Sequence, residues 1–271
     1  MTLERLRAAI LFRVRRARDD ATDAVERVRG RREPLTPPRR LLTGDYSDFS
    51  RLGGEFLDLF VRLGGLQPDH SVLDIGCGPG RMAVPLTRHL SAAGEYAGFD
   101  LVGEEVRWCQ EQITPRFPNF RFERVDVHNA RYNPRGSVEA SEFRFPYPDA
   151  SFDFAFATSV LTHMLAPDVE HYLDEIARVL RPGGHALLTW FLLTEESRAA
   201  LPTERFSFGH AEGPAFVNDL SSPEAAVAYP YEWAVERLAA GGLRLGSSHP
   251  GGWCGHPRPE TWQDVLVVER V

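Results

Sequence analysis

A glycine-rich turn preceded by an acidic residue is the part of this sequence with the clearest chemical meaning. Residues 72–81 read VLDIGCGPGR, so an apolar strand pattern runs into a turn that opens a helix pattern. Glycine lets the backbone turn tightly and lets a ligand approach without a Cβ in the way. Asp74 would lie at the carboxyl end of the strand, where open α/β sheets bind ligands. Its carboxylate could orient the N–H groups of the loop and contact a cationic ligand group through water.

Acidic residues also end the next two strand patterns. Asp100 follows Gly76 by about 24 residues, and an acid there can accept hydrogen bonds from both hydroxyls of a ribose. Asp126 ends the third strand pattern, where a short side chain could meet an adenine amino group. The glycines run GxGxG, a poor match to the dinucleotide fingerprint GxGxxG, but an acid at position 100 serves NAD and other adenosine ligands equally. These residues predict an adenosine ligand without choosing among such ligands.

The elements that must position these residues alternate from residue 50 onward. Alternating strands and helices predict a parallel sheet with helices on both faces. Residues 248–261 join the last two strands without a helix pattern, which favours an antiparallel hairpin at the sheet edge. The pattern predicts strands at residues 71–75, 96–99, 120–125, 151–158, 185–193, 243–247 and 262–269, and helices at 56–63, 82–90, 104–113, 169–180 and 231–240.

The chain divides into an arm, residues 1–43, and a domain, residues 44–271. The domain contains two insertions, at about residues 128–149 and 195–230, that do not fit the alternation. In the arm, apolar residues recur every three or four positions over 3–29, which predicts an amphipathic helix before a proline-rich linker. This helix could pack on its own domain, join two copies of the chain as a homo-oligomer or touch a membrane surface, and these alternatives stay open.

Composition and charge exclude several classes of function. The sequence has no lysine, which rules out Schiff-base and P-loop lysine chemistry. Residues 1–40 hold 12 arginines and 6 acidic residues while the whole chain has a net charge of −7, so the domain is strongly acidic and a poor partner for nucleic acid. No apolar run reaches the ~20 residues of a membrane helix, and no signal-peptide pattern is present. Three scattered cysteines fit a reducing compartment, so we expect a cytoplasmic protein.

Taken together, the motifs resemble those of class I S-adenosylmethionine-dependent methyltransferases. The segments VLDIGCGPGR, GFD, VDV, SFDFAFATSVLTHM and LRPGGHALLTW occur in the order and on the elements that this family uses. The resemblance covers residues 50–194 and, through WQDVLVVER, the C-terminal strand. It implies a seven-stranded, mostly parallel sheet of order 3-2-1-4-5-7-6 with strand 7 antiparallel. It also implies S-adenosylmethionine as cofactor and S-adenosylhomocysteine as product.

The resemblance assigns the cofactor contacts residue by residue. The glycine loop would line the methionine part, Asp100 and Leu101 the ribose and adenine, and Asp126 and Val127 the adenine amino group. Thr158 and Ser159, after the fourth strand, would border the methyl donor. The full set is Asp74, Gly76, Cys77, Gly78, Gly80, Asp100, Leu101, Asp126, Val127, Thr158 and Ser159.

His163 is the candidate for the catalytic base. It lies four residues after Ser159, hence near the reacting methyl, and histidine can take a proton at neutral pH. The alternative is a buried histidine bonded to backbone that only shapes the pocket. The acceptor is expected to meet Tyr46, His128, His163, Phe191 and His210. No cluster has metal-ligand spacing, so we expect no metal.

The substrate class follows from what is missing after the fourth strand. DNA amino-methylases carry (N/D)PP(Y/F) there, whereas this chain reads TSVL, and no cysteine stands where cytosine C5-methylases need one. The prediction is direct SN2 transfer of methyl to a small molecule, more often at oxygen than at nitrogen or carbon. Two alternatives stay open: a peptide or protein substrate docked through the arm, and a non-catalytic cofactor-binding protein.

Overall fold

The computed structural model of the protein describes residues 3–30, 32–42 and 46–271, with side chains for 16–30, 32–42 and 48–271. Strands and helices alternate as the sequence pattern predicts. The strands of the main sheet are β1 (Ser71–Ile75), β2 (Glu95–Asp100), β3 (Phe120–Arg124), β4 (Phe152–Ala157), β5 (Leu180–Trp190), β10 (Leu243–His249) and β11 (Asp264–Arg270). The helices of the domain are α2 (Tyr46–Arg62), α3 (Ala83–His89), α4 (Gly103–Gln112), α5 (Ala166–Val179), α6 (Glu195–Ala200) and α7 (Tyr231–Ala240).

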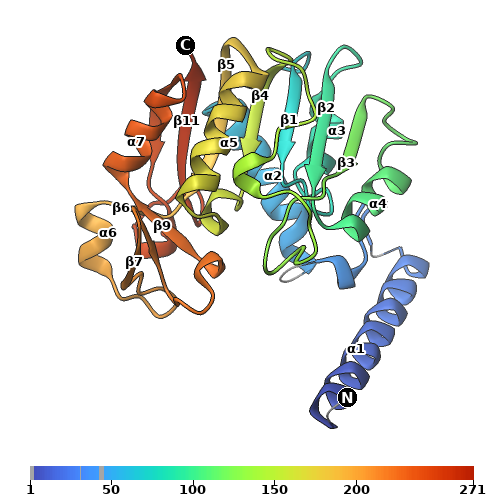
Figure 1. Ribbon diagram of the computed structural model, residues 1–271. Helices are drawn as coiled ribbons and strands as arrows, with labels where there is room; N and C mark the ends of the chain where they lie inside the picture. The colour runs from blue at the N-terminus through green and yellow to red at the C-terminus, as the bar shows by residue number, and fades with distance from the viewer. Residues whose placement is uncertain (1–2, 31, 43–45) are drawn as a thin grey trace.

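Within the described residues these strands form one seven-stranded sheet in the order β3-β2-β1-β4-β5-β11-β10 (Figure 1). The neighbours from β3 to β5 are parallel, and β11 runs antiparallel to both β5 and β10. The predicted strand order and the antiparallel last strand are therefore confirmed. The chain order reverses between β1 and β4, so the carboxyl ends of these two strands form the crevice where such sheets bind ligands.

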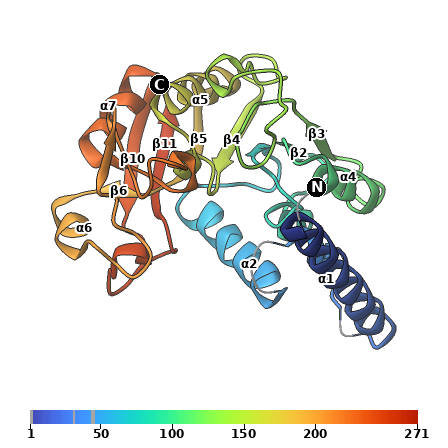
Figure 2. The ribbon, with the colours of Figure 1, turned by 60° about the horizontal axis from the view of Figure 1, so that its bottom comes forward.

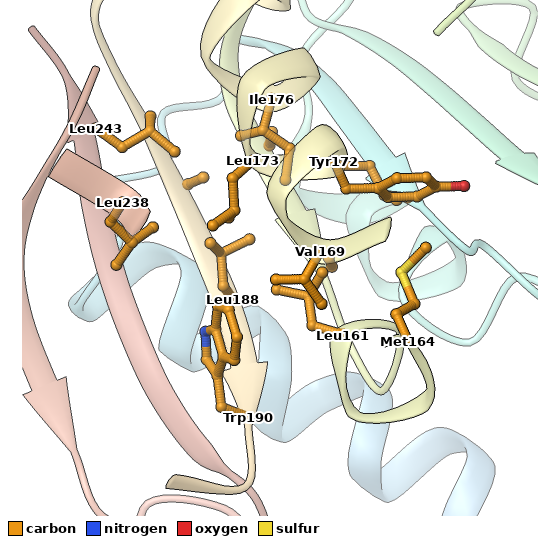
Figure 3. Close-up of a cluster of buried hydrophobic side chains, with 14 of the residues drawn as sticks. Leu161, Met164, Val169, Tyr172, Leu173, Ile176, Leu188, Trp190, Leu238 and Leu243 are labelled. Atoms are coloured by element: carbon orange, nitrogen blue, oxygen red, sulfur yellow. The ribbon is translucent and has the colours of Figure 1, made fainter. Parts of the chain in front are cut away.

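Two layers of helices bury the two faces of the sheet. Apolar side chains of α2, α3 and α4 pack on one face, and those of α5 and α7 pack on the other. In α5 the buried positions Val169, Leu173 and Ile176 recur every three or four residues, which puts them on one side of the helix. Figure 3 shows these side chains pointing toward Leu188 and Trp190 of β5. The packing holds the carboxyl ends of the strands in fixed positions.

The insertion at residues 195–230 is more regular than its sequence pattern indicates. It contains α6 and the short strands β7 (His210–Glu212), β8 (Ala215–Val217) and β9 (Val227–Pro230). With β6 (Leu192–Leu193) they form a second sheet in the order β6-β9-β8-β7. Strands of two to four residues are too short to show a hydrophobic period in the sequence, and they are stabilised by pairing with strands elsewhere in the chain. We call residues 192–230 the cover.

The arm begins with α1 (Leu3–Val28), whose N-terminal end extends away from the domain in Figure 1, and Figure 2 shows the helix on the side of the domain that holds α4. Its second half is attached to the domain. The buried carboxylate of Asp23 pairs with Arg32 and accepts a hydrogen bond of 2.9 Å from the backbone N–H of Arg39. Arg16 and Arg40 both reach Glu104 at the start of α4, at 3.1 and 3.0 Å. The linker thus folds back and fixes α1 beside α4.

Candidate active site

The glycine loop leaves β1 at the carboxyl edge of the sheet. Gly76 has φ +77°, a left-handed conformation that favours glycine, and an added Cβ would lie 2.6 Å from Val160 Cγ2. The backbone N–H groups of Gly76 and Cys77 both donate to Phe99 O at 3.0 Å, so β2 holds the loop. Gly76 is therefore required both by the turn and by the close approach of Val160.

Asp100 fixes the loop from the end of β2. Its Oδ2 accepts a hydrogen bond of 2.8 Å from Gly78 N–H, and its Oδ1 accepts one of 2.8 Å from Val102 N–H. Burial raises the pKa of Asp100, while these backbone hydrogen bonds act in the opposite direction. Each carboxylate oxygen keeps acceptor capacity, so Asp100 can order the loop and still accept from ligand hydroxyls.

Asp74 lies behind the loop and does not line the cavity. It is 1% exposed, and Tyr96 Oη donates a hydrogen bond of 2.6 Å to its Oδ2. Its Oδ1 is buried and has no hydrogen-bond partner among the described residues. Burial raises the pKa of Asp74 to about 8. The carboxyl group therefore has room for one more interaction, as expected for an acid that supports a ligand loop.

Glu105, in the first turn of α4, is a cavity residue that sequence reasoning missed. A Cβ on Gly78 would lie 3.4 Å from Glu105 Oε2. Burial and the negative charge of Asp100 raise the pKa of Glu105 to about 8. The sequence carried no clear signal, because acidic residues are common in the first turn of any helix. Three acids with raised pKa values, Asp74, Asp100 and Glu105, thus lie around the loop, and a cationic ligand there would favour their charged forms.

One cavity of about 1160 Å³ runs along the carboxyl ends of the strands and under the cover. Most of the residues that the sequence assigned to the cofactor or the acceptor contribute to its wall. They are Gly76, Cys77, Gly78, Asp100, Leu101, Val127, Thr158, Ser159, His128, His163 and Phe191. The volume exceeds the ~300–1,000 Å³ of ordinary ligand pockets, which leaves room for two molecules side by side.

Four predicted residues lie elsewhere. Asp74 and Gly80 belong to the support of the loop, and His210 is exposed on β7. Asp126 is exposed and accepts hydrogen bonds from Ser137 Oγ at 2.7 Å and Asn133 Nδ2 at 3.3 Å, contacts that lower its pKa. The side chain of Tyr46 lies outside the described residues. The structure therefore gives Asp126 a role in ordering its own loop and brings its neighbours Val127 and His128 to the cavity.

His163 ends the short 3-10 helix η3 (Leu161–His163), directly after β4. Its Nδ1 lies 2.9 Å from the backbone carbonyl oxygen of Glu224 in the cover. A carbonyl oxygen only accepts, so Nδ1 carries the hydrogen and, in the neutral ring, Nε2 has a free lone pair. Burial lowers the pKa of His163, which keeps the ring neutral at neutral pH. From the sequence, His163 is either a catalytic base or a histidine hydrogen-bonded to backbone. The geometry is compatible with both, because the hydrogen bond to backbone uses Nδ1 and leaves Nε2 able to accept a proton.

The part of the cavity wall near the cover also contains aromatic residues that the sequence did not assign to the site. Tyr132 and Trp262 are 42% and 50% exposed at the cavity wall, unusual for large aromatic side chains. Phe206 stands 4.8 Å from Phe191 between ring centroids, within the buried aromatic cluster of the cover. The predicted contact Phe191 is thus 4% exposed and mainly packs against other rings. The tertiary structure thus decides which aromatic rings face the cavity.

In the described part of the chain, no group of three or more His, Cys, Asp or Glu side chains is arranged to hold a metal ion. Among the described helices, none combines the length and the apolar character needed to span a bilayer.

The central part of the chain matches a known family. Residues 73–188 match the family described as a methyltransferase domain. The 27-O-demethylrifamycin SV methyltransferase of Amycolatopsis mediterranei is 35% identical over 136 residues, which are 49% of this chain and 43% of the relative. The chain therefore spans less than half the length of that curated relative.

Solved structures share the fold at low sequence identity. The 1,6-didemethyltoxoflavin-N1-methyltransferase of Burkholderia thailandensis, with 1,6-didemethyltoxoflavin and S-adenosylhomocysteine bound, has a TM-score of 0.50 and 19% identity, covering 83% of this chain and 80% of that one. The [4+2]-cyclase SpnF has a TM-score of 0.52 and 20% identity, covering 82% of this chain and 80% of that one. Since these two structures differ in named activity, the fold by itself does not specify the reaction.

Proposed function

Because residues 73–188 match a family described as a methyltransferase domain, we propose that this protein transfers a methyl group from S-adenosylmethionine to an oxygen of a small molecule. One observation carries the proposal: the glycine loop, Asp100 and His163 all face the same cavity of about 1160 Å³. A cofactor at the loop would leave the part of the cavity under the cover for an acceptor.

The residues at the loop fit this cofactor. S-adenosylmethionine supplies an electrophilic methyl group on a sulfonium and carries positive charge. Burial raises the pKa values of Asp74, Asp100 and Glu105, which favours their neutral forms, and the positive charge of a bound sulfonium would lower these pKa values and favour the carboxylates. Asp100 would hold the ribose hydroxyls, and the approach of Val160 to Gly76 shapes the wall at the methionine end.

His163 would act as the general base for an acceptor hydroxyl. Its Nδ1–H is fixed by Glu224 O at 2.9 Å, so Nε2 is the nitrogen that can take the proton. Because the carbonyl belongs to the cover, the ring is oriented by the same segment that closes the acceptor end. Direct SN2 displacement then requires the acceptor oxygen in line with the methyl group, which a closed cavity can enforce.

The arm gives no support to a docked peptide substrate. Within the described residues, Asp23 ties α1 to the linker, and Arg16 and Arg40 bind Glu104 of the protein's own domain. Exposed aromatic side chains at the cavity, Tyr132 and Trp262, instead favour an acceptor with a flat or apolar part. These contacts make a small molecule the better candidate.

The first experiment is calorimetric titration of the purified protein with S-adenosylmethionine, S-adenosylhomocysteine and NADH. We expect the two sulfur nucleosides to bind at micromolar concentration and NADH not to bind. The same protein is then incubated with S-adenosylmethionine carrying an isotopically labelled methyl group and a panel of phenols, alcohols and amines. Binding of NADH instead of the sulfur nucleosides would refute the proposal, and labelling of amines alone would refute the choice of oxygen.

A further inference from the structure

Ser159 adopts a backbone conformation that a non-glycine residue rarely takes. Its φ is +59°, in the left-handed region, immediately after β4 at the cavity wall. Such a conformation is costly and persists only where surrounding contacts hold it. Ser159 must therefore be held in this conformation by its contacts with neighbouring residues.

The contacts that hold Ser159 converge on Gln263, at the start of β11. Ser159 Oγ donates to Gln263 Oε1 at 3.0 Å, and Ser159 N–H donates to Thr189 Oγ1 at 2.8 Å. Thr189 Oγ1 in turn donates to the same Gln263 Oε1 at 2.7 Å. Gln263 Nε2 donates to Thr162 Oγ1 at 3.3 Å. One side-chain amide thus connects both polar groups of Ser159 to the neighbouring strand β5 and to η3.

The segment that Gln263 holds carries the functional groups of both ends of the cavity. Val160, the next residue, packs against Gly76 of the glycine loop. His163, four residues on, reaches the carbonyl of Glu224. Thr162 and Thr189 are 1% and 0% exposed and Gln263 is 9% exposed, so this side of the network is buried, whereas Ser159 itself is exposed at the cavity wall.

We propose that Gln263 is a positioning residue that keeps Ser159 in its left-handed conformation and thereby places the wall between the glycine loop and His163. The proposal rests on the proposed function, because it assumes that S-adenosylhomocysteine contacts this wall and that its affinity depends on where the wall lies. Gln263 acts through Ser159 and Val160, since the strain at Ser159 is released once the amide oxygen is removed.

The test compares Gln263→Leu with Gln263→Glu in calorimetric titrations with S-adenosylhomocysteine. Leucine keeps the size but leaves the hydroxyls of Ser159 and Thr189 without their acceptor, and we expect about tenfold weaker binding. Glutamate keeps the acceptor for both hydroxyls, and Thr162 Oγ1 can turn to donate, so binding should stay within about threefold of the wild type. Gln110→Leu is the matched control, because Gln110 bonds only the carbonyl of Phe122 at 2.8 Å, away from this network.

A double variant separates positioning from a general loss of stability. Ser159→Gly removes the strain, because glycine adopts φ +59° freely. We expect Ser159→Gly to recover most of the affinity lost in Gln263→Leu, whereas purely independent effects would be additive. If the leucine variant does not fold, Gln263→Asn takes its place, since the shorter amide cannot reach both hydroxyls.

The outcomes are distinct. Wild-type protein that binds no S-adenosylhomocysteine would refute the proposed function itself. Wild-type binding together with equal binding by folded Gln263→Leu, or strictly additive effects of the two substitutions, would overturn the role of Gln263 alone.

Discussion

Asp100→Asn is the sharpest perturbation of the candidate cofactor site. The carboxylate of Asp100 accepts one backbone hydrogen bond on each oxygen, from Gly78 N–H and from Val102 N–H, both at 2.8 Å. Asparagine has the same shape, but its NH₂ group must face one of these two N–H donors. The substitution therefore removes the negative charge, one loop contact and one acceptor for a ribose hydroxyl at the same time.

The expected magnitude follows from these contacts. A hydrogen bond to a charged group contributes roughly 1.5–3 kcal/mol, and every ~1.4 kcal/mol is a factor of ten in affinity. Asp100 is partly buried at the cavity wall, so solvent screens only part of this effect. Losing the charge-assisted bond to the ribose alone thus predicts about 10- to 100-fold weaker binding of both S-adenosylmethionine and S-adenosylhomocysteine.

Calorimetry with S-adenosylhomocysteine measures this loss directly and needs no acceptor. Asp153→Asn is the matched control, because Asp153 accepts from Ser71 N–H at 2.8 Å at the opposite end of β1. A thermal melt checks that both variants are folded. Asp100→Asn that melts like the wild type and binds within about twofold of it would show that Asp100 does not contact the cofactor.

Three further predictions concern other parts of the molecule. His163→Ala should lower turnover of an identified acceptor by roughly 100-fold while S-adenosylhomocysteine affinity is kept, and a loss of only a few-fold would make His163 a pocket residue. The folded pKa of Asp74, about 8, lies above its unfolded value of ~3.9, so its contribution to stability falls as pH rises between these values. Asp74→Asn should therefore reduce the fall in melting temperature between about pH 4 and pH 8, and an unchanged pH profile in that range would contradict this. Buried Asp264 accepts hydrogen bonds from the N–H groups of Leu192 and Gly251 at 2.7 Å and from Trp253 Nε1 at 2.8 Å. Asp264→Asn should therefore lower the free energy of unfolding, measured by urea titration, by about 2–3 kcal/mol. Unchanged stability would argue against this carboxylate as the anchor of the cover.

Local pattern predicted the main sheet well. The strand at residues 71–75 was found with the predicted bounds, and the hairpin of β10 and β11 was inferred from the missing helix between them. Both inferences depend on residues close in sequence, whose hydrophobic period and turn residues specify local structure. The family resemblance then supplied the strand order, which local pattern does not specify.

The cover escaped prediction because its stability is not local. Strands such as Ala215–Val217 are too short to show a period, and they form by pairing with β9 and packing on the rings around Phe191. The sequence marked residues 195–230 as an insertion that does not fit the alternation of strands and helices but placed no elements in it. In the same way, His210 has the right residue type, but its strand carries it to the exposed side of the second sheet.

The sequence alone determined the fold class, the glycine loop and the acids at the strand ends, because strand, turn and acid are consecutive along the chain. Only the tertiary structure decided which atoms act together. The Nδ1 of His163 meets a carbonyl 61 residues away, and Ser159 meets Gln263 across 104 residues. Such contacts depend on how separate elements pack, and burial among those elements is also what raises the pKa values of Asp74 and Glu105.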